Sequence, residues 1–452
     1  MSSGGPELPY QTLRGAARAL AARRISAREL TDAVLTRIEA LNPALGAFSD
    51  LVADRAREDA ARIDRQRAAK KKLGPLAGIP VAIKDLIDTV PARCSGGLPF
   101  RADNRPTQDA VAVRRLRRAG AIVVGVTATD PGAFNVRTPA VWHPLAPDRT
   151  VGGSSGGSGA ALAAGLAYGA LGTDTGGSIR IPAACCGVAG LKPTLGRVST
   201  AGVLPLAQSL DHVGPMARFA SDLGPLAQAL DPRYGEGGRR AKRRPIIVGT
   251  DPHYAADAEP LAAAGLERAL TLCEKLGAEI RSVSLPDPAI AAETHLSIFC
   301  ADSADFHFST FPDDIAGYPA SARDLLELAS TLPGYRYRRA LRQREQMRAL
   351  LKAVFSEVDI VLVPTLPVLP PARDAETITV GGRQLDFTLA LIRYTFVFDH
   401  TGNPVVSLPV TETAPGIGSS VQVVADKNRD ADAVDFASNL EALLGRAEEN
   451  HR

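Results

Sequence analysis

Residues 152–159 read Gly-Gly-Ser-Ser-Gly-Gly-Ser-Gly, and residues 172–180 read Gly-Thr-Asp-Thr-Gly-Gly-Ser-Ile-Arg. Glycine permits backbone conformations that a Cβ atom would forbid, so a substrate can approach the main chain closely at such turns. Unpaired N–H groups in a turn of this kind form a concavity that attracts negative charge. The two segments can therefore bring serine hydroxyls and free amides together, which is the minimum equipment for acyl transfer.

Ser178 is the first candidate nucleophile. A serine hydroxyl is a weak nucleophile and needs a base to take its proton. The amides of residues 175–177 can point at the oxygen that becomes negative when a carbonyl is attacked. The alternative interpretation is a flexible Gly-Ser linker, although apolar sequence follows Ser178 rather than more linker. From these residues alone, both interpretations stay open.

Two better-known motifs compete for the glycine-rich segments. No Lys-Ser/Thr pair follows the glycines, so the segment is not a phosphate-binding P-loop. The pattern Gly-x-Ser-x-Gly occurs twice, at Gly152–Gly156 and at Gly153–Gly157. That pattern forms a nucleophile elbow only when a buried strand leads into it, and here residues 143–150 are polar and interrupted by prolines. We therefore disfavour an α/β-hydrolase.

Lys84 is the candidate base. It ends the apolar run Leu-Ala-Gly-Ile-Pro-Val-Ala-Ile-Lys over residues 76–84, which is typical of a buried strand. A lysine has a pKa of about 10.4 and is protonated at neutral pH, but burial without a carboxylate partner lowers that pKa. The alternative is a lysine that pairs with the adjacent Asp85 at the strand end. Spacing does not decide between the two.

Several ordered motifs resemble the amidase signature family, and together they cover nearly the whole chain. They comprise residues 77–85, 152–158, 172–182, 186–194 and 209–215, followed by the C-terminal segments 401–404 and 407–409. The resemblance implies a single large α/β domain, in which a mixed, largely parallel β-sheet is sandwiched between α-helices. It also implies hydrolysis of amide bonds through an acyl-enzyme.

The resemblance assigns roles to individual residues. It implies that Ser178 is the nucleophile, Ser154 a bridging serine that follows a cis peptide bond, and Lys84 the base, with two serine hydroxyls and no carboxylate at its amine. The two serines lie 24 residues apart, which agrees with the family's spacing. The resemblance further implies an oxyanion hole and a supporting set. The oxyanion hole comprises the amides of Thr175, Gly176, Gly177 and Ser178, and the supporting set is Ser155, Asp174 and Arg180.

Departures from the family's pattern affect substrate recognition and leave Lys84, Ser154 and Ser178 unchanged. They occur at residues 127–134, 391–393 and 417–422, and the second of these lacks the acidic contact of glutamine-hydrolysing tRNA amidotransferase subunits. We take Phe134, Arg393 and His400 as candidate substrate contacts. His212 is expected to be structural.

The substrate is expected to be a small carboxamide or related amide. Two alternatives are a non-catalytic binding scaffold and the glutamine-hydrolysing subunit of a tRNA amidotransferase. The intact set Lys84, Ser154 and Ser178 argues against the scaffold.

Composition excludes several other classes. The 452 residues carry a net charge of +3, which gives no global field for nucleic acid. We expect residues 233–244 to form a solvated connector and residues 335–348 a polar helix face. The five cysteines are expected to be buried free thiols in a cytoplasmic protein without a signal peptide or membrane segment. No metal-ligand cluster appears, so we expect no metal and no cofactor; a homodimer stays open.

Strand-like and helix-like runs alternate along one domain that spans residues 1–452. Helices are expected over about 12–70, with a capping box from Ser26 to Glu29 and a second helix opening at Ser49. The apolar run 159–172 is typical of a buried helix. Residues from about 285 to 340 are aromatic, acidic and poorly periodic, and we expect a variable loop that shapes a pocket. Strands are expected at 80–83, 121–126, 245–249, 279–285, 359–363, 404–409 and 421–424, and helices at 108–118, 257–276, 337–355 and 430–444.

Overall fold

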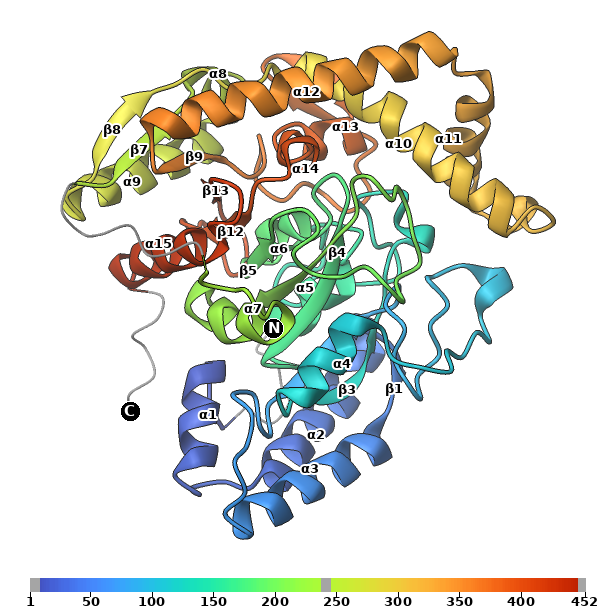
Figure 1. Cartoon of the computed structure of the whole chain (residues 1–452), viewed down its shortest axis with the longest axis vertical. Coiled ribbons are helices and arrows are strands. Elements are labelled where there is room, and N and C mark those ends of the chain that lie inside the picture. The colour runs from blue at the N-terminus through green and yellow to red at the C-terminus, as the bar shows by residue number, and fades with distance from the viewer. Residues whose placement is uncertain (1–8, 237–244, 446–452) are drawn as a thin grey trace.

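The computed structural model describes residues 9–236 and 245–445, which form an α/β fold around one long sheet (Figure 1). The eleven strands of the sheet and a separate hairpin, β10 and β11, have the following bounds: β1 Phe48–Leu51, β2 Pro80–Lys84, β3 Ile122–Thr127, β4 Gly169–Asp174, β5 Ala189–Lys192, β6 His212–Ala217, β7 Ile247–Thr250, β8 Glu279–Ser282, β9 Ile360–Pro364, β10 Thr377–Val380, β11 Arg383–Asp386, β12 Val405–Pro409 and β13 Ser420–Ala425.

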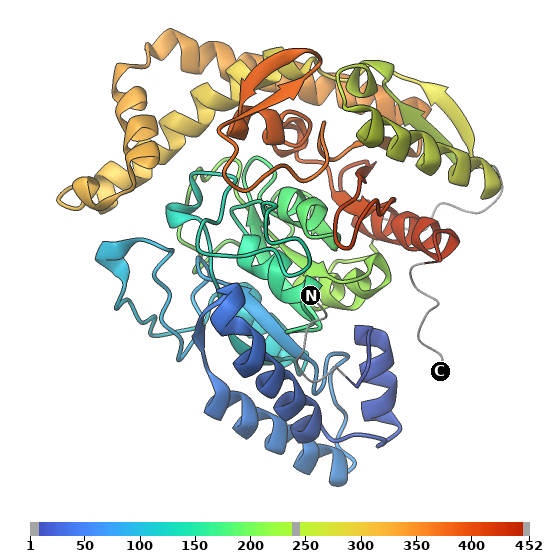
Figure 2. The same ribbon diagram turned by 180° about the vertical axis from the view of Figure 1, so that it is seen from behind.

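The helices have the following bounds: α1 Leu13–Ala21, α2 Ala27–Leu45, α3 Ala53–Ala68, α4 Val111–Arg118, α5 Gly156–Ala163, α6 Arg180–Cys185, α7 Leu223–Leu230, α8 Pro252–Ala256, α9 Pro260–Lys275, α10 Pro288–Thr310, α11 Ala320–Thr331, α12 Gly334–Glu357, α13 Phe387–Ile392, α14 Val397–Thr401 and α15 Asp430–Leu443. Helices α1–α3 lie at one end of the molecule and α10–α12 at the other, as both views show (Figures 1 and 2).

The sheet has the strand order β1-β3-β2-β4-β6-β5-β12-β13-β9-β7-β8. Parallel pairing is confined to two blocks, β3-β2-β4 and β9-β7-β8, and the strands between them pair antiparallel. Every residue of β2, β3, β4 and β6 is buried. Because both faces of these strands are covered, their sequences do not alternate between apolar and polar residues, and polar side chains occur only at their ends. The expected mixed α/β sheet between helices is confirmed.

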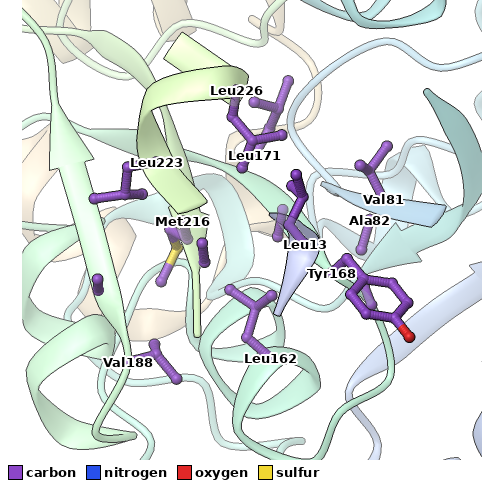
Figure 3. Close-up of a cluster of buried hydrophobic side chains, with 14 of the residues drawn as sticks. Leu13, Val81, Ala82, Leu162, Tyr168, Leu171, Val188, Met216, Leu223 and Leu226 are labelled. Carbon is purple, nitrogen blue, oxygen red and sulfur yellow. The ribbon is translucent and has the colours of Figure 1, made fainter. Parts of the chain in front are cut away.

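The core near the centre of the sheet is built from strands and the helices that pack on them. Figure 3 shows Leu162 of α5, Leu171 of β4, Met216 of β6 and Leu223 of α7 gathered in this cluster. All four side chains are buried. Full burial of such a side chain contributes about 1.5–3 kcal/mol, so this packing stabilises the position of β4 next to β6 and α5.

Parallel strands place the functional segments at one edge of the sheet. Lys84 is the last residue of β2, Thr127 the last of β3 and Asp174 the last of β4. Since the carboxyl ends of parallel strands meet at the same edge, the loops that follow them can build one site. The two glycine-rich segments quoted above begin or end at this edge.

Three expectations about local structure were wrong. Ser49 lies in β1, because residues 48–51 pair with β3, and the following helix begins only at Ala53. The apolar run 159–172 divides into the end of α5 and most of β4. The segment expected to be a loop from about 285 to 340 is largely helical in α10 and α11, since α10 packs on both α11 and α12 and this packing compensates for the missing periodicity.

The capping box and the free cysteines are confirmed as expected. Ser26 and Glu29 form the capping box at the start of α2. All five cysteines are buried and unpaired. In residues 9–236 and 245–445, no helix is both long and apolar enough to cross a membrane, and no cluster of three or more metal-ligand side chains occurs. The basic segment 233–244 falls mostly outside the described residues, whereas residues 335–348 lie on α12 as expected.

Candidate active site

Lys84 is fully buried at the end of β2. Its Nζ lies 2.7 Å from Ser154 Oγ and 2.7 Å from Thr173 Oγ1. Within the described chain no carboxylate forms an ion pair with this amine, and the neighbouring Asp85 instead accepts a hydrogen bond from Ser95 Oγ at 2.7 Å. The alternative of a Lys84–Asp85 pair is therefore wrong.

Burial lowers the pKa of Lys84 to about 7. The carboxylates of Asp130, Asp174 and Asp211 act in the opposite direction, but they do not offset the loss of hydration. A substantial fraction of the amine is therefore neutral at neutral pH. A neutral amine can accept a proton from a hydroxyl at hydrogen-bond distance, which an ordinary surface lysine cannot do.

Ser154 is held by the loop that leads into α5. The peptide bond between Gly153 and Ser154 is cis, as the family resemblance implies. The Ser154 carbonyl accepts a hydrogen bond from Thr129 Oγ1 at 2.9 Å and another from the Asp130 amide at 3.3 Å. A Cβ on Gly153 would lie 2.6 Å from backbone atoms of residues 136 and 137, so only glycine fits at that position. The backbone is thus fixed while the Ser154 hydroxyl faces Lys84.

Ser178 lies in the turn between β4 and α6 and is 6% exposed. Its carbonyl accepts the Ser155 amide at 3.2 Å, which joins the two glycine-rich segments. Among residues 9–236 and 245–445, the Ser178 hydroxyl makes no hydrogen bond. It is therefore not hydrogen-bonded to Ser154, the serine that is expected to bridge Ser178 and Lys84. The segment is buried and precedes a helix, which rules out a flexible linker.

Asp174 shapes this turn. Its carboxylate accepts the amides of Gly177 at 2.7 Å and Ile179 at 3.0 Å, and it binds the Arg180 guanidinium at 2.9 and 3.0 Å. Burial alone would raise the pKa of Asp174, but the Arg180 charge outweighs it and holds that pKa below its ordinary value. The Arg180 guanidinium is fully buried and also contacts Asp399 at 2.7 Å. These bonds fix residues 174–180 as one rigid turn.

The four amides expected in the oxyanion hole are not equivalent. The Gly177 N–H donates to Asp174, so this amide already has a partner and the expectation for it is corrected. Gly177 is required there for another reason: its φ is +135°, and a Cβ would lie 2.3 Å from Thr395 Oγ1. In the described part of the chain, the amides of Thr175, Gly176 and Ser178 make no hydrogen bond. Those three are available to a developing negative oxygen.

The three candidate substrate contacts, Phe134, Arg393 and His400, each have different neighbours. Phe134 is buried and packs edge-on against Phe299 with ring centroids 6.1 Å apart. Arg393 pairs with Asp257. His400 is fully buried, and its Nε2 lies 3.2 Å from His295 Nδ1.

His212 belongs to the hydrogen-bond network beneath the turn. Its Nδ1 lies 3.2 Å from the Asp174 carbonyl and its Nε2 lies 3.1 Å from Lys192 Nζ. Burial and the Lys192 charge lower the pKa of His212 well below its ordinary value. It is therefore a neutral structural group, as expected.

Three neighbours of the site were missed from the sequence. Thr173 takes the place at Lys84 that the family resemblance gives to a second serine. Thr395 Oγ1 donates to the Gly176 carbonyl at 2.5 Å and so anchors the turn from the far side. His295 lies beside Gly176: a Cβ added to Gly176 would lie 3.0 Å from the His295 imidazole. Only Thr173 lies inside a quoted motif, and its role depends on the register between β2 and β4.

The site is nearly closed to solvent. Lys84 and Ser154 are fully buried, and Ser178 retains only the slight exposure given above. A cavity of about 970 Å³ lies elsewhere, lined by residues that include Arg149, Glu259 and Thr377, and none of the site's residues lines it. Water-poor surroundings strengthen each electrostatic contact in the site.

A family model, curated relatives and solved structures each match most of this chain. The family model described as Amidase matches residues 29–434. An amidase of Pseudomonas putida is 35% identical over 428 residues, which cover 90% of this chain and 91% of that protein. A glutamyl-tRNA(Gln) amidotransferase subunit of Chloroflexus aurantiacus is 35% identical over 410 residues, which cover 80% of this chain and 83% of that protein. A solved structure described as an amidase has a TM-score of 0.88 at 31% identity and covers 96% of this chain and 100% of its own.

Proposed function

Because this chain belongs to the amidase family and hydrolyses amide C–N bonds, we propose that it cleaves a small carboxamide or related amide through an acyl-enzyme on Ser178. One observation carries the proposal. A buried lysine, its pKa lowered to about 7, lies 2.7 Å from the Ser154 hydroxyl without a carboxylate partner among the described residues.

The proposed first step is attack by Ser178 Oγ on the amide carbonyl carbon. The Ser178 proton passes to Ser154 Oγ, while the Ser154 proton passes to the neutral Lys84 amine. For this transfer the Ser178 hydroxyl must rotate toward Ser154 when substrate binds. Hydrogen bonds in unliganded sites are commonly long or open and tighten only with substrate.

The tetrahedral intermediate carries a negative oxygen. We assign its stabilisation to the amides of Thr175, Gly176 and Ser178, and loss of one such donor costs about 10²- to 10³-fold in rate. Collapse breaks the C–N bond, and the leaving amine receives the proton stored on Lys84 through Ser154. Water then attacks the Ser178 ester by the same relay, which releases the acid and restores the serine.

Ser155, Asp174 and Arg180 are proposed to support this site without contacting substrate. Ser155 Oγ donates to the Thr173 carbonyl at 3.3 Å, which ties the two glycine-rich segments together a second time. Asp174 and Arg180 fix the turn that carries Ser178, as described above. Phe134 and Arg393 stay candidates for the wall of the substrate pocket.

We propose that the chain acts alone rather than as part of an amidotransferase. Relatives of both kinds are equally similar in sequence. The supporting observation is at Arg393, where glutamine-hydrolysing subunits are expected to have an acidic contact and this chain has a guanidinium paired with Asp257. Five unpaired buried thiols favour a reducing compartment, so we also propose a cytoplasmic location.

The isolated protein is expected to release ammonia or amine from aryl or alkyl amides without added subunits. Purified chain is assayed against a panel of primary and secondary amides, with L-glutamine included and with Ser178→Ala as the blank. Turnover of at least one amide other than glutamine supports the proposal. Activity on glutamine alone, and only after amidotransferase subunits are added, would reverse the assignment.

Activity is expected to rise with pH through a single limb centred near pH 7. Below that value the Lys84 amine is protonated and cannot accept the Ser154 proton, whereas above it the amine is neutral. The measurement is kcat/KM against pH with a substrate that does not titrate between pH 5.5 and 9.5. Asp130→Asn is the diagnostic variant: burial raises the pKa of Asp130 to about 7, and its ionised form in turn raises the pKa of Lys84, so its replacement should move the limb to lower pH. A flat or falling profile would contradict Lys84 as the base.

A further inference from the structure

Two histidines that the proposed mechanism does not use are in contact beside the turn over residues 174–180, which carries the proposed oxyanion hole. His295 lies on α10 and His400 on α14, two helices that pack together at the end of the molecule formed by α10–α12 (Figure 1). His295 Nδ1 lies 3.2 Å from His400 Nε2, and the two rings are nearly perpendicular at 84°. The contact is buried on both sides, so it is a structural pair and not a surface encounter.

Aromatic side chains hold the His295 ring in one orientation. The ring is stacked on Phe299 at 5.5 Å and on Phe396 at 5.4 Å, with interplanar angles of 26° and 21°. Its free edge faces Gly176, where a Cβ would lie 3.0 Å from both Cε1 and Nε2. His295 Nε2 is therefore placed next to a residue whose amide is unpaired and whose carbonyl is fixed by Thr395.

The surroundings of His400 decide which nitrogen of His295 carries the proton. In a neutral pair, one ring donates and the other accepts. The second nitrogen of His400, Nδ1, is buried without a hydrogen-bond partner among the described residues. A buried N–H without a partner is rarer than an under-used acceptor, so the proton of His400 belongs on Nε2. His400 then donates to His295 Nδ1, which leaves His295 with its proton on Nε2.

The His295 donor is uncharged. Burial lowers the pKa of His295 to about 4, and the Asp174 carboxylate opposes this shift only in part. Burial, His295 and the guanidinium groups of Arg344 and Arg348 lower the pKa of His400 well below its ordinary value. At neutral pH the site therefore presents a neutral N–H, which suits an uncharged acceptor.

We propose that His295 is a specificity-determining residue, which donates its Nε2–H to an uncharged acceptor atom of the substrate next to the scissile amide, and that His400 is a positioning residue that holds this tautomer. The inference rests on the proposed function, because it places the substrate carbonyl at the Ser178 turn. The preferred substrates are amides with a carbonyl oxygen, ether oxygen or ring nitrogen close to the reacting carbon.

The test compares amides that differ in a single acceptor atom. One set is benzamide with the three pyridinecarboxamides, and the other is butyramide with 2-methoxyacetamide. The wild-type protein is expected to prefer an acceptor-bearing member over its partner by about five- to tenfold in kcat/KM, as one neutral hydrogen bond allows. His295→Leu should abolish this preference by lowering kcat/KM for that member, while the partner stays within about threefold. His295→Gln, which keeps an amide donor, should restore part of it.

The tautomer is checked independently of activity. Nitrogen-15 imidazole shifts of the intact labelled protein should show the Nε2–H form for His295, and His400→Leu should mix the two forms and raise KM more than it lowers kcat. His253→Leu is the matched control, because His253 is exposed on α8, away from the site. Circular dichroism and thermal melts verify that each variant is folded.

The outcomes separate this inference from the proposed function. Equal turnover of both members of every pair by the wild type, an unchanged preference in His295→Leu, or an Nδ1–H form at His295 would each overturn the inference alone. Failure of the wild type to hydrolyse any amide in either set would overturn the inference, and failure on the whole panel of primary and secondary amides as well would overturn the proposed function.

Discussion

Ser178→Ala is expected to abolish turnover, with kcat lower by roughly 10⁵- to 10⁶-fold, because the variant cannot form the acyl-enzyme. The fold should be unaffected. The Ser178 hydroxyl makes no hydrogen bond in the described residues and is slightly exposed, so its removal should change the free energy of unfolding by less than about 0.5 kcal/mol. Both quantities are measured on the same preparation, by amide turnover and by urea unfolding.

Ser155→Ala is the matched control for Ser178→Ala. Ser155 is the central serine of one of the two Gly-x-Ser-x-Gly patterns, but among the described residues its hydroxyl forms hydrogen bonds only with the backbone of Thr173. It should retain a measurable fraction of activity and lose some stability. Near-normal turnover in Ser178→Ala, together with complete loss in Ser155→Ala, would contradict the assignment and favour the elbow interpretation.

Lys84→Met is expected to lower kcat by roughly 10⁴-fold or more, since Lys84 is the one side chain among the described residues that forms a hydrogen bond with the Ser154 hydroxyl. Methionine fills a similar volume without a charge. The loss should not add to that of Ser178→Ala, because residues that act as one unit fail together. The double variant should therefore be no less active than Ser178→Ala alone.

The stability of Lys84→Met should depend on pH in a defined direction. The lysine titrates near 10.4 in the unfolded chain and near 7 in the folded protein. Below pH 7 the wild type must bury a charged amine, between 7 and 10.4 folding must release a proton, and above 10.4 the penalty vanishes. The stability difference should thus shift toward the Met variant as pH falls from 10 to 7, as urea unfolding at several pH values would show.

Lys275→Met is the control for that series. Lys275 is exposed at the end of α9 and should show neither the loss of activity nor the pH-dependent gain. If Lys84→Met hydrolyses amides at a rate close to that of the wild type at neutral pH while folded, the lysine is not the base.

The sequence predicted the parts of the fold whose signals are local. The capping box at Ser26, the apolar strands that became β2 and β3, and the helix that became α15 needed only neighbouring residues. The division of residues 159–172 into helix and strand did not have such a signal, because a short apolar run is compatible with either. Pairing with β2 and β6 decides that β4 is a strand.

In the candidate site, too, residues within local motifs were predicted, whereas residues placed by long-range packing were missed. Lys84, Ser154 and Ser178 were found from motif resemblance, and the structure brings Lys84 to Ser154 and the Ser178 turn to Ser155. Thr173 was missed because its contact with Lys84, 89 residues away in the sequence, depends on the register between two strands. His295 was missed because it lies in a segment without helical periodicity, on a helix whose position is set by packing on α12 and α14.

Mapping the serine that a fluorophosphonate modifies shows directly whether Lys84 activates Ser178. The intact protein is treated with a fluorophosphonate, digested, and sequenced by tandem mass spectrometry, with Ser178→Ala and Lys84→Met treated in parallel. We expect a single label on Ser178, no label in Ser178→Ala, and slow labelling in Lys84→Met. A label on Ser154 or Ser155, or equally fast labelling after Lys84 is replaced, would contradict a Ser178 nucleophile activated by Lys84.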